Sequence, residues 1–154
     1  GKEVKNVAFI QCAGSRDENH LPYCSGICCL VSMKQALYIR EQLPDCDATI
    51  FFIDIRALDR LEDFYNKVKE DEKITFTKSK IANIAEDPET GDLLLEGENT
   101  NTGEQIRATF DMVVLATGGK YQYGRADSGD VRHGGAGYRH GAQPYRTRIG
   151  RRDL

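Results

Sequence analysis

The sequence predicts an α/β fold built on a largely parallel β-sheet, and three observations support this prediction. First, apolar runs of strand length at residues 7–11, 48–55 and 110–118 are typical of strands buried on both faces. Second, apolar residues recur at helical spacing in residues 25–43 and 58–68, between the early strands. Third, two glycine-containing turns later in the chain indicate antiparallel hairpins.

The first half of the chain predicts a βαβαβ unit. A strand over residues 7–11 leads into a helix over 25–43, which a proline ends. The run 48–55 is rich in β-branched and aromatic residues and predicts a second strand. A second helix over 58–68 and a short strand over 74–77 complete the unit. This order of elements is that of a Rossmann-like parallel sheet.

The second half changes to an antiparallel pattern. Strands over residues 80–86, 92–99 and 105–110 are joined by turns that place glycine where a hairpin needs positive φ. They predict a three-stranded β-meander. A last apolar run, 110–118, ends in small residues and predicts a further parallel strand. We expect residues 1–118 to form one Rossmann-like domain.

The composition changes after Gly118. Residues 119–154 carry seven Arg and one Lys against three Asp, hold eight glycines, and contain few aliphatic residues. So little apolar surface cannot offset the entropy of ordering, which predicts a disordered tail or a stretch foreign to the fold. An Arg/Gly/Tyr arm that binds nucleic acid is a less favoured interpretation.

Composition also limits the compartment. The chain has 154 residues, 40% hydrophobic and 29% charged, as expected for one globular domain. Neither a membrane-spanning run nor a secretory signal is visible, which predicts a cytoplasmic protein that reaches a membrane surface only through partners. In a reducing compartment, cysteines serve as ligands or redox thiols more often than as disulfides.

Four cysteines gather early in the chain, at Cys12, Cys24, Cys28 and Cys29, with the spacing C-x11-C-x3-C-C. They lie between the first predicted strand and the first helix, where a nucleotide-binding domain carries its glycine-rich turn. A helix N-terminus lowers thiol pKa values and favours an anionic cluster. Four thiolates can hold one iron–sulfur cluster or one zinc ion. Cys46 follows a proline in a later loop and is interpreted as a bystander.

A [4Fe–4S] cluster is the favoured interpretation of these four thiols. Structural zinc lacks its usual paired C-x2-C knuckles, and a dithiol pair or inert buried thiols also stay open. Adjacent Cys28 and Cys29 cannot point the same way from a regular helix, so both can be ligands only if the backbone there is irregular. Without a Gly-x-Gly-x-x-Gly turn a dinucleotide has no cradle, and Asp54 and Arg56 are expected to form a structural salt bridge or interdomain contact.

The sequence resembles the A subunit of heterodisulfide reductase and its relative, the A subunit of the quinone-interacting membrane-bound oxidoreductase. Its most specific motifs are FIQCAGSR, PYCSGICC and DMVVLATG. The matching stretches are residues 9–16, 22–29, 34–36, 52–56, 64–65 and 111–118. The resemblance implies a thioredoxin-reductase-like flavoprotein with FAD and iron–sulfur clusters, of which residues 1–118 are the inserted NAD(P)-binding-like domain.

By this resemblance the chain is a fragment of an oxidoreductase subunit that passes electrons between FAD and the clusters of partner subunits. Thr117 and Gly118 would approach the flavin, whose own glycine-rich half is absent from the sequence, so the chain alone is expected to be inactive and not to retain FAD. No catalytic residue, nucleic-acid partner or membrane insertion is expected. A structural zinc-binding interaction domain and an NAD(P)H-binding reductase domain are the alternatives.

Overall fold

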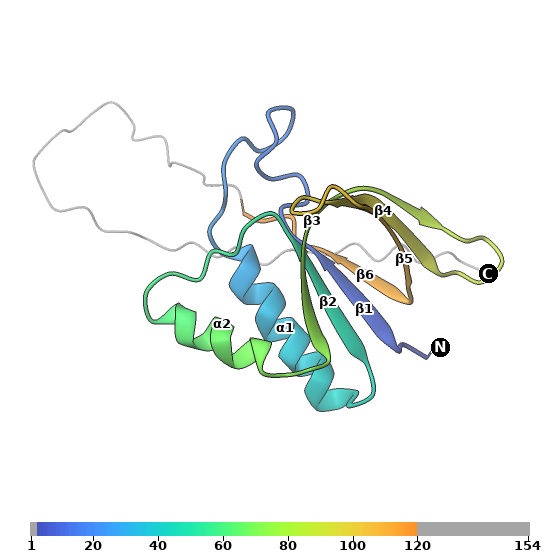
Figure 1. Ribbon diagram of the computed structural model, residues 1–154, viewed down its shortest axis with the longest axis horizontal. Coiled ribbons are helices and arrows are strands. Elements are labelled where there is room, and N and C mark those ends of the chain that lie inside the picture. Colours follow the sequence, from blue (N-terminus) through green and yellow to red (C-terminus); the bar gives the residue numbers. More distant parts are fainter. Residues whose placement is uncertain (1–2, 120–154) are drawn as a thin grey trace, which may run out of the picture. The chain divides into compact units, whose positions relative to one another are not determined.

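The computed structural model describes residues 3–119, and the predicted tail lies outside them except for Gly119. One six-stranded sheet has the order β5-β4-β3-β2-β1-β6 (Figure 1). The elements are β1 (Asn6–Ile10), α1 (Cys28–Gln42), β2 (Asp47–Phe52), α2 (Leu61–Lys69), β3 (Ile74–Glu86), β4 (Leu93–Asn99), β5 (Gln105–Phe110) and β6 (Met112–Leu115). Strands β6, β1, β2 and the first part of β3 are parallel, and β3, β4 and β5 form an antiparallel meander. The predicted fold class is confirmed.

Strand β1 lies between two parallel neighbours, which explains its continuous apolar sequence. Phe9 pairs with Ile50 of β2 on one side and with Val114 of β6 on the other. Helices α1 and α2 cover one face of the sheet, where Phe9, Ile50, Met33 and Val68 form a buried core. Burying such side chains supplies about 1.5–3 kcal/mol each, so this core fixes the carboxyl end of β1.

The opposite face holds a second core, between the parallel strands and the meander. It contains Ala8, Ile10, Phe51, Leu95 and Phe110. The rings of Phe51 and Phe110 meet edge to face, with centroids 5.7 Å apart. Alternate residues of β1 and β2 thus face opposite cores, as strand geometry requires.

Strand β3 differs from its prediction, because residues 74–77 and 80–86 belong to one strand. Its first part pairs with β2 and its second part with β4, and the register shifts between Ile81 and Asn83. This irregularity bends one strand from the parallel sheet into the meander, so no turn is needed. Gly97 lies against the bend, where a Cβ would come within 2.5 Å of the Lys80 carbonyl oxygen.

Both helices begin three residues later than predicted. Helix α1 begins at Cys28, and Gly26 before it has φ +70°, which lies outside the helical region. Helix α2 begins at Leu61 after Asp59, with φ 57°. Neither N-cap forms a side-chain capping hydrogen bond. Within residues 3–119 no helix has the length and apolar character of a membrane span.

Candidate metal centre and adjoining pocket

Cys12 lies immediately after β1, where the chain turns sharply. Cys12 has φ 59°, an uncommon conformation for a residue with a side chain, and its carbonyl accepts a hydrogen bond from the Ser15 amide at 3.0 Å. The loop then doubles back, because the Arg16 amide donates to the Tyr23 carbonyl at 3.3 Å and Leu21 pairs with Ser15. This fold returns the chain toward the end of β1 just before Cys24.

Cys24 and Cys28 belong to the short segment that leads into α1. The Gly26 amide donates a hydrogen bond to the Cys24 sulfur at 3.4 Å. The Cys28 sulfur lies 3.0 Å from the Ser25 hydroxyl oxygen. Both sulfurs therefore already have polar neighbours of the kind that stabilise thiolates bound to metal.

Cys29 makes different contacts from its neighbour. Its side chain is 5% exposed and belongs to the core beneath α1, and its thiol donates to the Asp54 carbonyl at 3.8 Å. Cys28 and Cys29 thus have separate surroundings at the first turn of a regular helix. Within residues 3–119 no three His, Cys, Asp or Glu side chains are arranged to hold a metal ion. To bind one metal ion or cluster jointly, these thiols would have to rotate toward one another.

The other thiols of the set affect the pKa values of Cys12 and Cys29. Burial raises the pKa of Cys12, the Arg16 guanidinium partly lowers it, and the three other thiols raise it further. Burial is also the main cause of the raised pKa of Cys29, which Cys24 and Cys28 increase. All four thiols are free. Buried thiols with raised pKa values stay protonated at neutral pH unless a cation stabilises the thiolates, and a metal or cluster supplies that charge.

An ion-pair cluster fixes the loop to the end of β2. Asp54 accepts a hydrogen bond from Arg16 at 2.7 Å and another from Arg56 at 3.1 Å. The same residue's carbonyl accepts from the Cys29 thiol. The structural salt bridge expected for Asp54 and Arg56 is therefore present, and it also places the positive charge of Arg16 beside Cys12.

Gly118 follows β6 and packs against the cysteine loop. It has φ +76°, and a Cβ there would lie 2.8 Å from the hydroxyl oxygens of Ser15 and Ser25 and 3.3 Å from the Cys28 sulfur. The Ser15 hydroxyl donates to the Thr117 carbonyl at 3.0 Å. The residues expected to approach a flavin are therefore joined directly to the thiol site. Cys46, in contrast, lies buried before β2, at the other end of the parallel strands.

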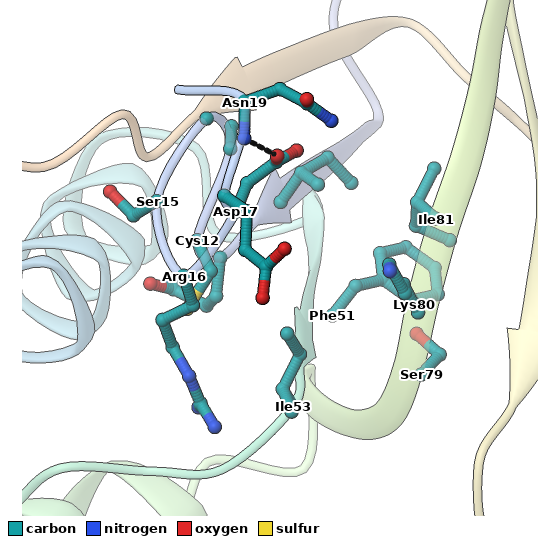
Figure 2. Close-up of a pocket in the computed structure, with 15 residues that line it drawn as sticks. Cys12, Ser15, Arg16, Asp17, Asn19, Phe51, Ile53, Ser79, Lys80 and Ile81 are labelled. Atoms are coloured by element: carbon teal, nitrogen blue, oxygen red, sulfur yellow. Dashed lines mark hydrogen bonds between the residues drawn. The ribbon is translucent and has the colours of Figure 1, made fainter. Parts of the chain in front are cut away.

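A pocket of about 500 Å³ adjoins the thiol site, between the loop and strands β2 and β3. Figure 2 shows Phe51, Ile53 and Ser79 along one wall, and the loop residues Arg16 and Asp17 opposite them. Cys12 also lines it. The sequence pattern does not reveal this pocket, since its far wall comes from β3, a single bent strand that the pattern predicts as two strands.

Sequence comparison decides the relationship. No protein-family model matches the chain. One of the iron–sulfur A subunits of CoB–CoM heterodisulfide reductase from Methanopyrus kandleri is 41% identical over 120 residues, which cover 77% of this chain and 18% of the relative. The A subunit of the H2:CoB-CoM heterodisulfide,ferredoxin reductase from Methanothermobacter thermautotrophicus is also 41% identical over 120 residues, which again cover 77% of this chain and 18% of the relative. The chain is similar to one segment of the heterodisulfide reductase A subunit.

This finding confirms the resemblance drawn from the cysteine motifs. The chain spans less than one fifth of the length of the heterodisulfide reductase A subunits that it matches. The corresponding protein of Methanocaldococcus jannaschii shows the same pattern, with 38% identity over 120 residues. The similarity therefore covers most of this chain and a single segment of each relative.

One solved structure agrees with the fold. Ornithine hydroxylase from Pseudomonas aeruginosa, in its reduced form, aligns with a TM-score of 0.51 at 13% identity, over 77% of this chain and 37% of that protein. Thioredoxin reductase from Lactococcus lactis aligns over 73% of this chain and 31% of its own, with 18% identity and a TM-score of 0.48. At these identities the likeness of the hydroxylase concerns the fold alone.

Proposed function

We propose that this chain is the cluster-carrying segment of an electron-transferring oxidoreductase subunit of the heterodisulfide reductase A type. In this proposal Cys12, Cys24, Cys28 and Cys29 hold one [4Fe–4S] cluster. The observation that carries it is the placement of four free thiols after β1 and at the start of α1, where the Gly118 position meets both Ser15 of the loop and the Cys28 sulfur. Similarity to a protein named as an iron–sulfur subunit supports it.

The surroundings of the thiols suit a thiolate-bound cluster, although the side chains must reorient. The Gly26 amide and the Ser25 hydroxyl lie beside the Cys24 and Cys28 sulfurs, where they would stabilise negative charge on sulfur. Hydrogen bonds to the sulfurs and burial set the reduction potential of such a cluster. When bound, the cluster supplies one-electron transfer. The chain's own residues place it, exclude water from Cys29 and hold Arg16 nearby through Asp54.

We further propose that Thr117 and Gly118 contact FAD in the full-length protein, and that partner subunits of the complex exchange electrons with this segment in the cytoplasm. The position of Thr117 and Gly118 supports the flavin contact, because Gly118 packs against the Ser15, Ser25 and Cys28 side chains. A flavin beside Gly118 would thus lie next to the thiol site, so electrons would need to cross only a short distance between the two groups.

The test is an absorption spectrum of the 154-residue chain after anaerobic reconstitution with iron and sulfide. A brown protein that absorbs broadly near ~400 nm, as iron–thiolate centres do, is expected. Titration with zinc in place of iron distinguishes the structural-zinc alternative. A colourless protein that retains stoichiometric zinc and no iron would replace the cluster with a structural metal site. Saturable binding of NADH without iron uptake would instead favour a nicotinamide-binding domain.

A further inference from the structure

Strand β6 lies at one end of the sheet, and its outer edge pairs with no strand among residues 3–119 (Figure 1). The hydrogen bonds to β1 show which backbone groups lie along that edge. The Ala116 amide donates to the Ile10 carbonyl of β1 at 2.9 Å. Because the backbone groups of a strand alternate between its two sides, those of Val114 also point toward β1. The N–H and C=O groups of Val113 and Leu115 therefore point outward, away from β1.

The side chains of β6 are those of an interior strand. Val114 packs against the core beneath the helices, and Val113 packs against the core of the meander. Met112 and Leu115 are large and apolar, yet they are 44% and 52% exposed. The run from Met112 to Ala116 contains neither a charge nor a proline. Strand edges that stay open to water commonly carry such residues, because they prevent pairing with other chains.

The opposite edge of the same sheet, β5, has this protection. Gln105, Arg107 and Thr109 are exposed and alternate with residues that face the core. Arg107 also pairs with Glu96 of β4 at 3.6 Å, which places a charge along this edge. The sheet thus has one protected edge and one unprotected edge, and the unprotected edge of β6 is the one suited to pairing.

The sequence of β6 is complementary to a second copy of itself in the antiparallel direction. When Val114 lies opposite Val114 of the second copy, Val113 lies opposite Leu115 of that copy. The outward-pointing backbone groups of these two residues then exchange both of their hydrogen bonds, and symmetry repeats the exchange, which gives about four bonds. Every cross-strand pair from Met112 to Ala116 is apolar, so the contact buries no charge.

We propose that this chain forms a symmetric dimer by antiparallel pairing of β6 with β6 of a second copy. The half-exposed Leu115 is then covered by Val113 of the second copy. The Leu115 carbonyl accepts from the Thr117 amide at 3.1 Å and keeps a second lone pair for the new bond. Since both copies use the same edge, the contact closes at two copies. It is small, because β6 has only four residues, and the dimer therefore dissociates on dilution.

The dimer does not depend on the proposed cluster. Gly118 meets the thiol site just beyond the carboxyl end of β6. Antiparallel pairing about Val114 carries the two copies of this end in opposite directions. The two thiol sites therefore lie at opposite ends of the paired strands, and neither takes part in the contact.

Sedimentation equilibrium of the metal-free 154-residue chain, with its thiols kept reduced, tests the dimer. We expect the average mass to rise from that of one chain toward that of two as the concentration increases. Leu115→Lys places a charge in the apolar contact and should weaken the dimer about tenfold or more. Thr109→Lys places the same charge on the β5 edge and should dimerise like the parent chain. Val113→Pro removes an outward N–H, leaves the bonds to β1 intact, and should also weaken the dimer.

Amide hydrogen exchange locates the contact. The amides of Val113 and Leu115 should be protected in concentrated solution and exchange rapidly on dilution. Protection that is independent of concentration would show that the chain covers this edge itself, with residues 120–154 as the available segment, and it overturns the proposal. A monomer at up to about 1 mM, a series of species larger than a dimer, or a dimer that neither Leu115→Lys nor Val113→Pro weakens also overturns it. Iron uptake enters none of these measurements, so the cluster assignment is tested separately.

Discussion

Replacing Gly118 by alanine tests whether the end of β6 and the cysteine loop form one unit. Gly118 has φ +76°, a conformation that costs a residue with a Cβ about 1–2 kcal/mol. The new Cβ would also lie 2.8 Å from two hydroxyl oxygens and 3.3 Å from the Cys28 sulfur, so these groups must move. Displacing Ser15 breaks its 3.0 Å bond to the Thr117 carbonyl, worth about 1 kcal/mol.

The sum of these effects is a loss of about 2–3 kcal/mol in the free energy of unfolding. Two glycines of the same chain separate the causes. Gly91 has φ +70° with nothing within 4 Å of its Cβ position, so Gly91→Ala measures backbone strain alone, about 1–2 kcal/mol. Gly119 has open space and no positive φ, so Gly119→Ala should change stability little.

The assay is urea denaturation of the three variants, followed by iron content after anaerobic reconstitution. Gly118→Ala should be the least stable and should retain less iron than Gly91→Ala, because only Gly118 touches the thiol site. Equal stability of Gly118→Ala and Gly119→Ala would refute the packing of β6 against the loop. Equal iron content in Gly118→Ala and Gly91→Ala would separate Gly118 from the proposed cluster.

Three further predictions follow from single contacts. Gly97→Ala should lower the free energy of unfolding by about 2 kcal/mol in urea denaturation, since its Cβ meets the Lys80 backbone at 2.5 Å; a loss below that of Gly91→Ala would contradict this. The free energy of unfolding of the metal-free chain should fall as pH rises through and above 9.0. Unfolded thiols release their protons in this range, whereas burial raises the pKa values of Cys12 and Cys29 in the folded chain and keeps them protonated. A free energy of unfolding that stays constant between about pH 8 and about pH 10 would contradict this prediction. Asp54→Ala should change the free energy of unfolding by only about 0–1 kcal/mol, because the ion pairs of Asp54 are partly exposed. The same change should release the loop and so speed alkylation of Cys12 and Cys29. An unchanged alkylation rate would show that the ion pairs do not hold the loop.

Particular residues show which parts of the fold follow from sequence. The apolar runs around Phe9 and Ile50 and the glycine turns at Gly91 and Gly103 gave the strands and the meander, because local pattern decides them. The continuity of β3 was missed, since its bend depends on a register shift against β4 and on space at Gly97. Local patterns carry no information on such pairings.

The sequence likewise predicts only part of the candidate site. The placement of Cys12 after a strand and of Cys28 at a helix start followed from spacing. The contact of Gly118 with Ser15 and Ser25 did not, because more than ninety residues separate them in the chain.

Iron and sulfide content of single cysteine variants tests the central claim most directly. Each of Cys12, Cys24, Cys28 and Cys29 is replaced by serine in the 154-residue chain, with Cys46→Ser as the matched control, since Cys46 is buried apart from the loop. The variants are reconstituted anaerobically and their bound iron is measured. The account predicts a sharp loss of iron in each of the four variants and a content like the parent chain in Cys46→Ser. Full retention of iron in two or more of the four would contradict a cluster held jointly by these thiols.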